Sequence, residues 1–196
     1  MNAEIIHDLI EQRRSVGLLH DPAPSNEQLM MALQMAQYAP DHRCLQPTQF
    51  IIVEREQRKN FAQILIDSLR ADKGEADEIQ MERIQQQVMR APMLVLAFTK
   101  IQQNEKVPAF EQLLSTGAAV QNVLLSLQAQ GFATMWRTGE WVNSDYLKQY
   151  FGFNSEDYLS AIIYIGSATR AIPPRTVEPQ VDFIRTLPQF PQPTAN

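Results

Sequence analysis

The segment at residues 110–130 constrains the fold of this chain most, because it is apolar on almost every side when it is drawn as a helix. Its aliphatic side chains do not gather into one stripe: Leu113, Leu114, Ala118, Val120, Leu124, Leu125 and Leu127. A surface helix carries one apolar stripe, whereas a helix that is hydrophobic all round is buried. Gly131 follows, and glycine readily takes the left-handed conformation that ends helices. We therefore expect a central helix that the rest of the fold covers.

Short apolar runs predict the strands. Residues 50–53 and 93–98 are unbroken β-branched and aromatic runs, as in strands that are buried on both faces. Further strands are predicted at residues 133–137 and 159–165. Helices are predicted at residues 3–12 and at residues 145–151, the latter after Ser144. Another helix begins at Ser25, where Gln28 completes a capping box. Two more helices are predicted between the first two strands, joined near Lys73 and Gly74. No linker separates two complete cores, so we expect one domain over residues 1–196.

Half of the twelve prolines lie in the last segment, residues 171–196: Pro173, Pro174, Pro179, Pro188, Pro191 and Pro193. Proline has no backbone N–H and fixes its own φ, so this segment is predicted to be extended and unable to form a core. It must lie across another surface.

Composition excludes several classes of function. A net charge of -5 argues against nucleic-acid binding. The single cysteine, Cys44, excludes an internal disulfide, and the three histidines lack metal-ligand spacing, so we expect no metal. The seven glycines are too scattered for a Walker loop or a dinucleotide fingerprint. No signal peptide and no run of membrane-spanning length is present, which favours the cytoplasm.

The first polar cluster is Arg13-Arg14-Ser15, at the end of the first predicted helix. A guanidinium matches phosphate geometry with paired hydrogen bonds, and a hydroxyl adds another donor. The alternative is that these arginines only complement the dipole of the helix. Taken alone, the cluster leaves both interpretations open.

Two more clusters follow. Pro40 and Pro47 bracket a polar loop before a buried strand, which would either hold side chains toward a ligand or only connect two elements. The other cluster lies at the end of the third predicted strand and is Trp136-Arg137-Thr138-Gly139. An arginine there is costly to bury without an anion, and a glycine allows a flat ring to approach the backbone. Trp136 could equally be part of the core.

The order and residue identities of these motifs resemble those of the nitroreductase family of flavoproteins, and in particular its short bacterial NAD(P)H nitroreductases. In chain order the motifs are Arg13-Arg14-Ser15, Ala39-Pro40-Asp41-His42 with Gln46-Pro47, Arg90-Ala91-Pro92, Gly131 with Trp136-Arg137-Thr138-Gly139, and Tyr164-Ile165-Gly166. The match runs from about Ile5 to Gly166. The resemblance implies an α+β fold with a mainly antiparallel central sheet flanked by helices, and an intertwined homodimer with an extended C-terminal arm.

The resemblance also implies two FMN sites at the subunit interface. Arg13, Arg14 and Ser15 would bind FMN from one subunit, with Arg13 and Ser15 nearest the phosphate. Trp136, Arg137 and Thr138 would line the same subunit's side of the site, and Tyr38 and His42 would reach it from the other subunit. A nicotinamide-nucleotide segment is implied at Ser126-Leu127-Gln128-Ala129-Gln130-Gly131, which also reads as the end of the buried helix.

Two positions depart from the family pattern. Close relatives often have arginine where this chain has Tyr38, so that contact would be lost or replaced by stacking. Many members have an aromatic residue after Gln46-Pro47, where this chain has Thr48, which implies a wider and more polar substrate pocket.

The implied activity is the transfer of hydride from NADH or NADPH, through FMN, to an electron-poor acceptor such as a nitroaromatic. The chemistry would lie on the cofactor, so no residue is expected to act as catalytic acid, base or nucleophile. Three alternatives stay open: a quinone, enone or halogenated acceptor; a flavin-binding carrier or sensor with little turnover; and a cofactor-free dimer.

Overall fold

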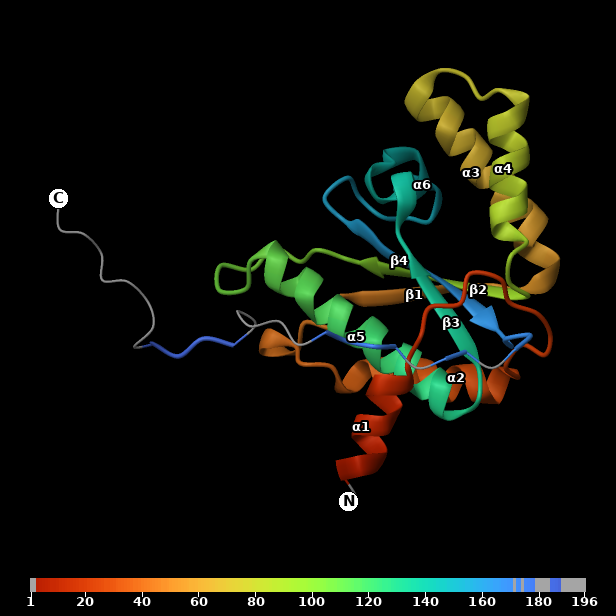
Figure 1. The fold of residues 1–196 in the computed structure, drawn as a ribbon. Coiled ribbons are helices and arrows are strands. Elements are labelled where there is room, and N and C mark those ends of the chain that lie inside the picture. The colour runs from red at the N-terminus through yellow and green to blue at the C-terminus, as the bar shows by residue number, and fades with distance from the viewer. Residues whose placement is uncertain (1–2, 171, 174, 179–183, 188–196) are drawn as a thin grey trace.

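The structure of the protein is a computed structural model that describes residues 3–170, 172–173, 175–178 and 184–187. Its centre is one sheet of four strands in the order β1-β2-β4-β3, and each pair of neighbours is antiparallel (Figure 1). The strands are β1 Thr48–Val53, β2 Met93–Thr99, β3 Ala133–Arg137 and β4 Tyr158–Gly166. The predicted α+β fold with a mainly antiparallel sheet is therefore confirmed.

Helices cover both faces of this sheet. The described helices are α1 Ala3–Gln12, α2 Asn26–Gln34, α3 Arg58–Lys73, α4 Glu78–Val88, α5 Ala109–Ala129 and α6 Asp145–Tyr150. Helices α2 and α5 pack on one face, and α3, α4 and α6 pack on the other. Figure 1 shows α3 and α4 as a hairpin whose tip extends away from the sheet.

Strand β2 explains why its sequence is apolar without interruption. Alternate side chains of a strand point to opposite faces. Leu94 and Phe98 accordingly join the core under α3 and α6, whereas Val95 and Ala97 join the core under α5. Every residue of β2 is buried.

Local signals place the helix ends where the sequence predicts them. The Ser25 hydroxyl accepts a hydrogen bond from the Gln28 backbone N–H, and the Gln28 side chain accepts one from the Ser25 N–H, which completes the capping box of α2. The Ser144 hydroxyl caps α6 by accepting a hydrogen bond from the Leu147 N–H. Gly131 follows α5 with φ of 88°.

Helix α5 departs from the prediction of a helix covered on all sides. Val120, Val123 and Leu127 are fully buried against the sheet, but Phe110 and Leu114 are 60% and 68% exposed. The reason is geometric, because one sheet and one neighbouring layer cover only part of a helix surface. The uncovered part of α5 is apolar, so it lacks the polar face of an ordinary surface helix.

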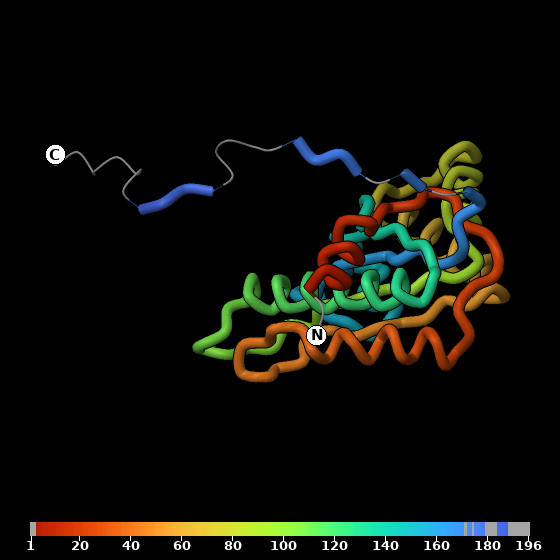
Figure 2. The backbone as a smooth tube through the Cα atoms, turned by 60° about the horizontal axis from the view of Figure 1, so that its bottom comes forward, coloured from red at the N-terminus to blue at the C-terminus, as the bar shows by residue number. Residues whose placement is uncertain are grey.

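Both ends of the chain also expose apolar side chains. Helix α1 contains no buried residue, and Ile5, Ile6 and Ile10 are exposed. In the C-terminal segment the described apolar residues Val177 and Ile184 are exposed as well, and Figure 2 shows residues 184–187 away from the body of the molecule. The remainder of the predicted extended segment, residues 171, 174, 179–183 and 188–196, lies outside the described residues.

Gly166 has the tightest surroundings of the seven glycines and yields a stability prediction. A Cβ at this position would lie 2.7 Å from Cδ of Pro92 and 2.8 Å from the carbonyl oxygen of His20, and neither can move without shifting backbone or a proline ring. We expect Gly166→Ala to lower the free energy of unfolding by about 2 kcal/mol, measured by urea denaturation. Gly117→Ala is the control, because a Cβ there meets only Trp136 at 4.0 Å. Within α5 that change should stabilise by up to about 1 kcal/mol, and an equal loss in both variants would contradict the steric account.

Candidate functional site

The Arg13–Ser15 segment lies along the edge strand β3. Past the end of α1 the chain runs parallel to β3, with a bridge between Ser15 and Thr134 and a hydrogen bond of 2.9 Å from the Val16 N–H to the Thr134 carbonyl oxygen. An edge strand offers unpaired backbone groups, which explains why a passing segment attaches there. The sheet thereby fixes the backbone of the first predicted cluster.

The side chains of this segment hold hydrogen-bond donors that the described residues leave free. Arg13 is half-buried, and neither its guanidinium nor the exposed Ser15 hydroxyl has a hydrogen-bond partner among the residues that the structure describes. Arg14 donates one hydrogen bond from Nη1 to the Pro173 carbonyl oxygen at 2.7 Å. A guanidinium carries five N–H donors, so Arg14 keeps most of its own. The cluster is therefore able to bind an anion.

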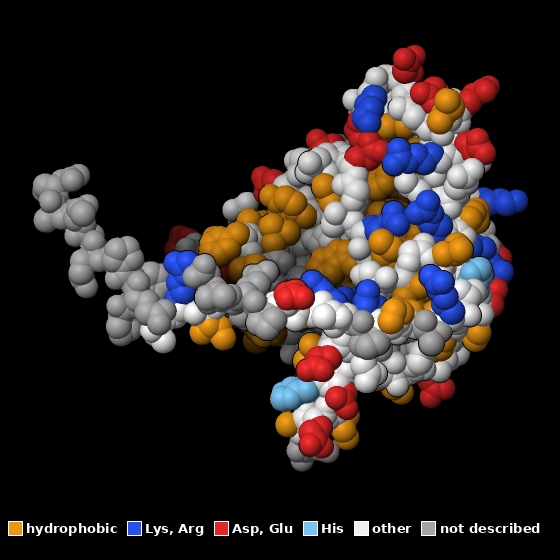
Figure 3. All heavy atoms as spheres, viewed as in Figure 1, with side chains coloured by type: hydrophobic (Ala, Val, Ile, Leu, Met, Phe, Trp, Pro, Cys, Tyr) orange, Lys and Arg blue, Asp and Glu red, His pale blue; other side chains and the backbone are white. Residues whose placement is uncertain are grey.

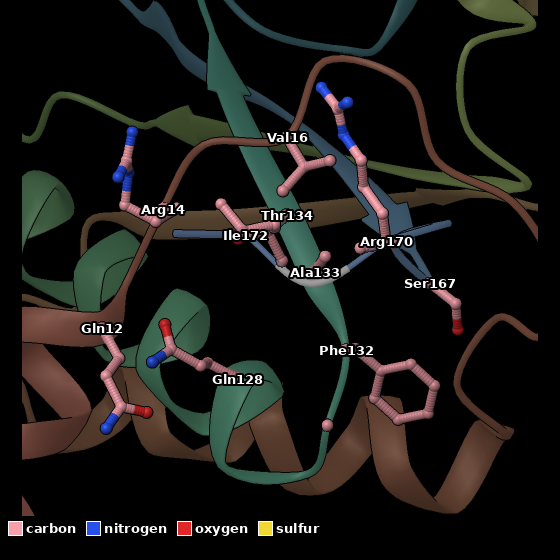
Figure 4. Close-up of a pocket in the computed structure, with 12 residues that line it drawn as sticks. Gln12, Arg14, Val16, Gln128, Phe132, Ala133, Thr134, Ser167, Arg170 and Ile172 are labelled. Atoms are coloured by element: carbon pink, nitrogen blue, oxygen red, sulfur yellow. The ribbon is translucent and has the colours of Figure 1, made fainter. Parts of the chain in front are cut away.

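A cavity of about 560 Å³ lies beside this segment, between α1, the end of α5 and β3. Its polar lining comes from Gln12, Arg14, Gln128, Thr134, Ser167 and Arg170. Figure 4 shows the side chains of Arg14 and Arg170 on either side of Thr134, extending in the same direction. Sequence reasoning missed Arg170, because no motif marks it and only the fold brings it beside Arg14.

Arg137 and Thr138 line a second cavity, of about 620 Å³, between the sheet and the α3–α4 hairpin. The guanidinium of Arg137 lies 5.6 Å from the centre of the Tyr164 ring, and its Nε lies 3.3 Å from Sδ of Met135. Burial raises the pKa of the Tyr164 phenol, and the positive charges of Arg137 and Arg90 partly oppose that rise. The phenol therefore stays neutral at physiological pH.

Trp136 points to the other face of the sheet. Its ring packs against the core under α5, and its Nε1 donates a 3.0 Å hydrogen bond to the Ser160 carbonyl oxygen. The side chains of Trp136 and Arg137 consequently do not share a cavity. Within one chain the side chains of Arg137 and Thr138, but not of Trp136, face the second cavity.

His42 occupies a strained loop at the other end of α5. Its Nδ1 lies 2.7 Å from Oε2 of Glu111, in the first turn of that helix. Arg43, Cys44 and Gln46 have φ of 63°, 53° and 51°. Such conformations cost about 1–3 kcal/mol each in residues other than glycine, and they cluster at functional sites. The sequence marked this loop through its prolines but did not predict the pairing with Glu111.

One chain leaves the predicted FMN residues far apart. Glu111, beside His42, and Gln128, beside Arg14, are separated by most of α5, which is about 25 Å at 1.5 Å per residue. Tyr38 ends a short 3-10 helix, Met35–Tyr38, and is 78% exposed. A single ligand of FMN size does not span this separation. The structure thus brings Arg13, Arg14 and Ser15 together but leaves Tyr38 and His42 elsewhere.

The segment predicted to bind the nicotinamide nucleotide forms the last turn of α5 and the residues after it. Leu127 is buried, Gln128 donates to the Leu9 carbonyl oxygen at 2.9 Å, and Gln130 donates to the Gln28 carbonyl oxygen at 3.2 Å. Gln128 and Gly131 also line the 560 Å³ cavity. The helix end that the sequence predicts is present, and the nucleotide role stays a prediction.

Thr48, the second departure from the family pattern, already has a hydrogen-bond partner within the chain. Its hydroxyl donates a 3.0 Å hydrogen bond to Oγ1 of Thr116, and it lines a smaller cavity of about 280 Å³.

Among the described residues we find no group of three or more side chains placed to hold a metal ion. In the same part of the chain, no helix has both the length and the apolar character needed to cross a bilayer.

The sequence is similar to known proteins over most of its length. The model of the nitroreductase family matches residues 10–167. The Escherichia coli (strain K12) protein named "Putative NAD(P)H nitroreductase YdjA" is 33% identical over 160 residues, which cover 82% of this chain and 86% of that protein.

Solved structures show the same fold. A nitroreductase-like family protein from Bacillus cereus superposes with a TM-score of 0.78 at 20% identity, covering 93% of this chain and 95% of that one. A nitroreductase with bound FMN from Bacteroides fragilis gives a TM-score of 0.69 at 14% identity, covering 95% and 100%. The motifs, the fold and the family match over residues 10–167 together show that this chain belongs to the nitroreductase family.

Proposed function

We propose that the protein is an FMN-dependent oxidoreductase that passes hydride from NADH or NADPH to an electron-poor acceptor such as a nitroaromatic. The observation that carries this proposal is the pair of free anion donors, Arg13 and Ser15, fixed beside β3. The names of the relatives and the FMN-bound structural neighbour support it.

The residues present fit the phosphate of FMN. Arg13 is half-buried and unpaired among the described residues, so it has an incomplete set of hydrogen bonds and a charge to neutralise. Arg14 retains donors beyond its bond to Pro173, and the Ser15 hydroxyl adds one more. Three adjacent donors on a backbone held by the sheet match a phosphate dianion.

The ring of FMN would lie near the end of β3. Ser15 pairs with Thr134, so Arg137 is about 10 Å further along the strand. Bound FMN supplies the hydride chemistry, which no side chain here can supply. Arg137 would place a positive charge near the bound ring and so favour its reduction, and the neutral Tyr164 beside Arg137 adds no opposing charge.

The site is completed by a second copy of the chain in this proposal. His42 and Tyr38 lie about one helix length from Arg13, so they reach the same ligand only from a partner. The exposed apolar side chains of α1 and α5, and the apolar Val177 and Ile184 of the C-terminal segment, provide the surface for such a partner. An extended arm adds contact area without needing a core of its own.

The test is the visible spectrum of the purified protein after loading with FMN, followed by anaerobic addition of NADH or NADPH. We expect stoichiometric flavin absorbance that bleaches with at least one nicotinamide and returns on adding a nitroaromatic. A protein that takes up no FMN would overturn the proposal. Flavin that binds and bleaches, but recovers only with a quinone, enone or halogenated compound, would correct the acceptor. Flavin that never bleaches would favour a carrier or sensor.

A further inference from the structure

The contact between His42 and Glu111 fixes one nitrogen of the imidazole ring. Nδ1 of His42 lies 2.7 Å from Oε2 of Glu111. An ionised carboxylate only accepts hydrogen bonds, so the proton of this bond belongs to Nδ1. Glu111 lies in the first turn of α5, where the helix dipole favours an anionic side chain. Nε2 has no hydrogen-bond partner among the described residues, so it is available to another molecule.

The backbone around His42 is held without this contact. The Asp41 carboxylate accepts a 2.7 Å hydrogen bond from the Gln46 N–H. The Asp41 carbonyl oxygen accepts another, of 3.1 Å, from the Cys44 N–H. Both bonds lie inside the loop and close it on itself, so the positive φ angles of the loop do not depend on the imidazole ring.

A separate connection ties the loop to the start of α5. The Gln102 side chain donates a hydrogen bond to the Leu45 carbonyl oxygen. The backbone of Gln102 in turn exchanges two hydrogen bonds of 2.9 Å with the side chain of buried Gln112. The loop is therefore joined to the helix through amide groups alone. What the His42–Glu111 contact adds is the direction of the imidazole ring.

The pair lies at the apolar surface that the proposed dimer would cover. Phe110 and Leu114 flank Glu111 on α5 and are exposed, and Figure 3 shows hydrophobic side chains at the surface around the start of this helix. In a single chain the side chains of His42 and Glu111 are 52% and 33% exposed. An exposed ion pair contributes little to stability, but the same charges interact more strongly where a partner excludes water.

We propose that Glu111 is a positioning residue for the flavin site: it holds the His42 ring with the proton on Nδ1, so that Nε2 faces the FMN bound by the other copy of the chain. The inference rests on the proposed function, because His42 reaches a flavin only across the subunit interface. Glu111 itself does not touch the cofactor. It acts through His42, so its contribution to FMN binding vanishes when His42 is absent.

A double-mutant cycle on FMN affinity tests this dependence. We expect Glu111→Ala and His42→Ala each to weaken FMN binding about 3- to 10-fold, the range for one hydrogen bond, measured by quenching of flavin fluorescence. The double variant should bind FMN no more weakly than His42→Ala alone. If Glu111 acted only on the helix end or on the local charge, its loss would weaken FMN binding equally with and without His42. That result would overturn the proposal.

The protonation of the ring is measured before FMN is added. The chain has three histidines, so the His42 signals in a ¹H–¹⁵N imidazole spectrum are those that disappear in His42→Ala. At about pH 8, where an ordinary imidazole is neutral, we expect the proton on Nδ1 in the wild type and on Nε2 in Glu111→Ala. A wild-type ring whose Nδ1 carries no proton would contradict the proposed role of Glu111.

Glu105→Ala is the matched control, because Glu105 is an exposed carboxylate in the segment before α5, whereas the His42 ring pairs with Glu111. It removes the same charge and should leave both the FMN affinity and the ring protonation unchanged. Equal effects of Glu105→Ala and Glu111→Ala would rule out a positioning role. A wild type that takes up no FMN overturns the proposed function and this inference together. A wild type that binds FMN, with the same affinity in Glu111→Ala, overturns this inference alone.

Discussion

Replacing Arg13 with alanine is expected to weaken FMN binding about 10- to 100-fold. The half-buried guanidinium has no hydrogen-bond partner among the described residues. Binding an FMN phosphate would therefore form new hydrogen bonds without breaking one within the chain. Hydrogen bonds to charged groups contribute about 1.5–3 kcal/mol, which corresponds to this range of affinity. Quenching of flavin fluorescence on titration of the apoprotein measures the change.

Two further variants separate a phosphate contact from a general charge effect. Arg13→Lys keeps the charge but loses the paired geometry, so we expect an intermediate affinity. Arg70→Ala is the control, because Arg70 is exposed on α3 and pairs with Asp67. If Arg13→Ala retains FMN as well as Arg70→Ala does, Arg13 belongs to the helix end alone, as the alternative interpretation of its sequence holds.

The parts of the fold that the sequence predicted are those encoded by neighbouring residues. The Ser25–Gln28 capping box, the Ser144 cap and the left-handed Gly131 each need only a few consecutive residues. The unbroken apolar run of β2 identified a strand that is buried on both faces. Burial within α5 depended instead on which neighbours cover it, and Leu114 is left exposed.

The candidate site was predictable where a motif marks it and not where distant segments meet. Arg13 and Ser15 were proposed from adjacent residues, and the fold adds only that they lie along β3. His42 was proposed too, but its contact with Glu111 joins positions 69 residues apart. Arg170 belongs to no motif, and it lines the same cavity as Arg14 only because the fold brings the chain after β4 beside the end of α1. A single sequence does not specify such long-range contacts.

The exposed apolar side chains of α1 allow a test of whether a second copy of the chain completes the site. An isolated helix of fewer than about 12 residues is marginal in water, and the ten residues of α1 bury none of their side chains in the described chain. We expect Ile6→Glu to weaken the proposed dimer at least about 100-fold, because symmetry applies the loss of about 1.5 kcal/mol of apolar burial twice. Sedimentation velocity at micromolar protein measures the shift to monomer.

If a second copy completes the site as proposed, flavin content falls together with the dimer, because a monomer lacks the His42 and Tyr38 of the partner subunit. Ile79→Glu is the matched control: Ile79 is 79% exposed at the start of α4, and we expect that variant to stay dimeric and saturated with FMN. Glutamate near the start of a helix is favourable to its dipole, so neither substitution weakens its own helix through charge. An Ile6→Glu protein that sediments as a monomer and still binds one FMN per chain would show that one chain builds the whole site. The separation of His42 from Arg13 along α5 would then have no functional meaning.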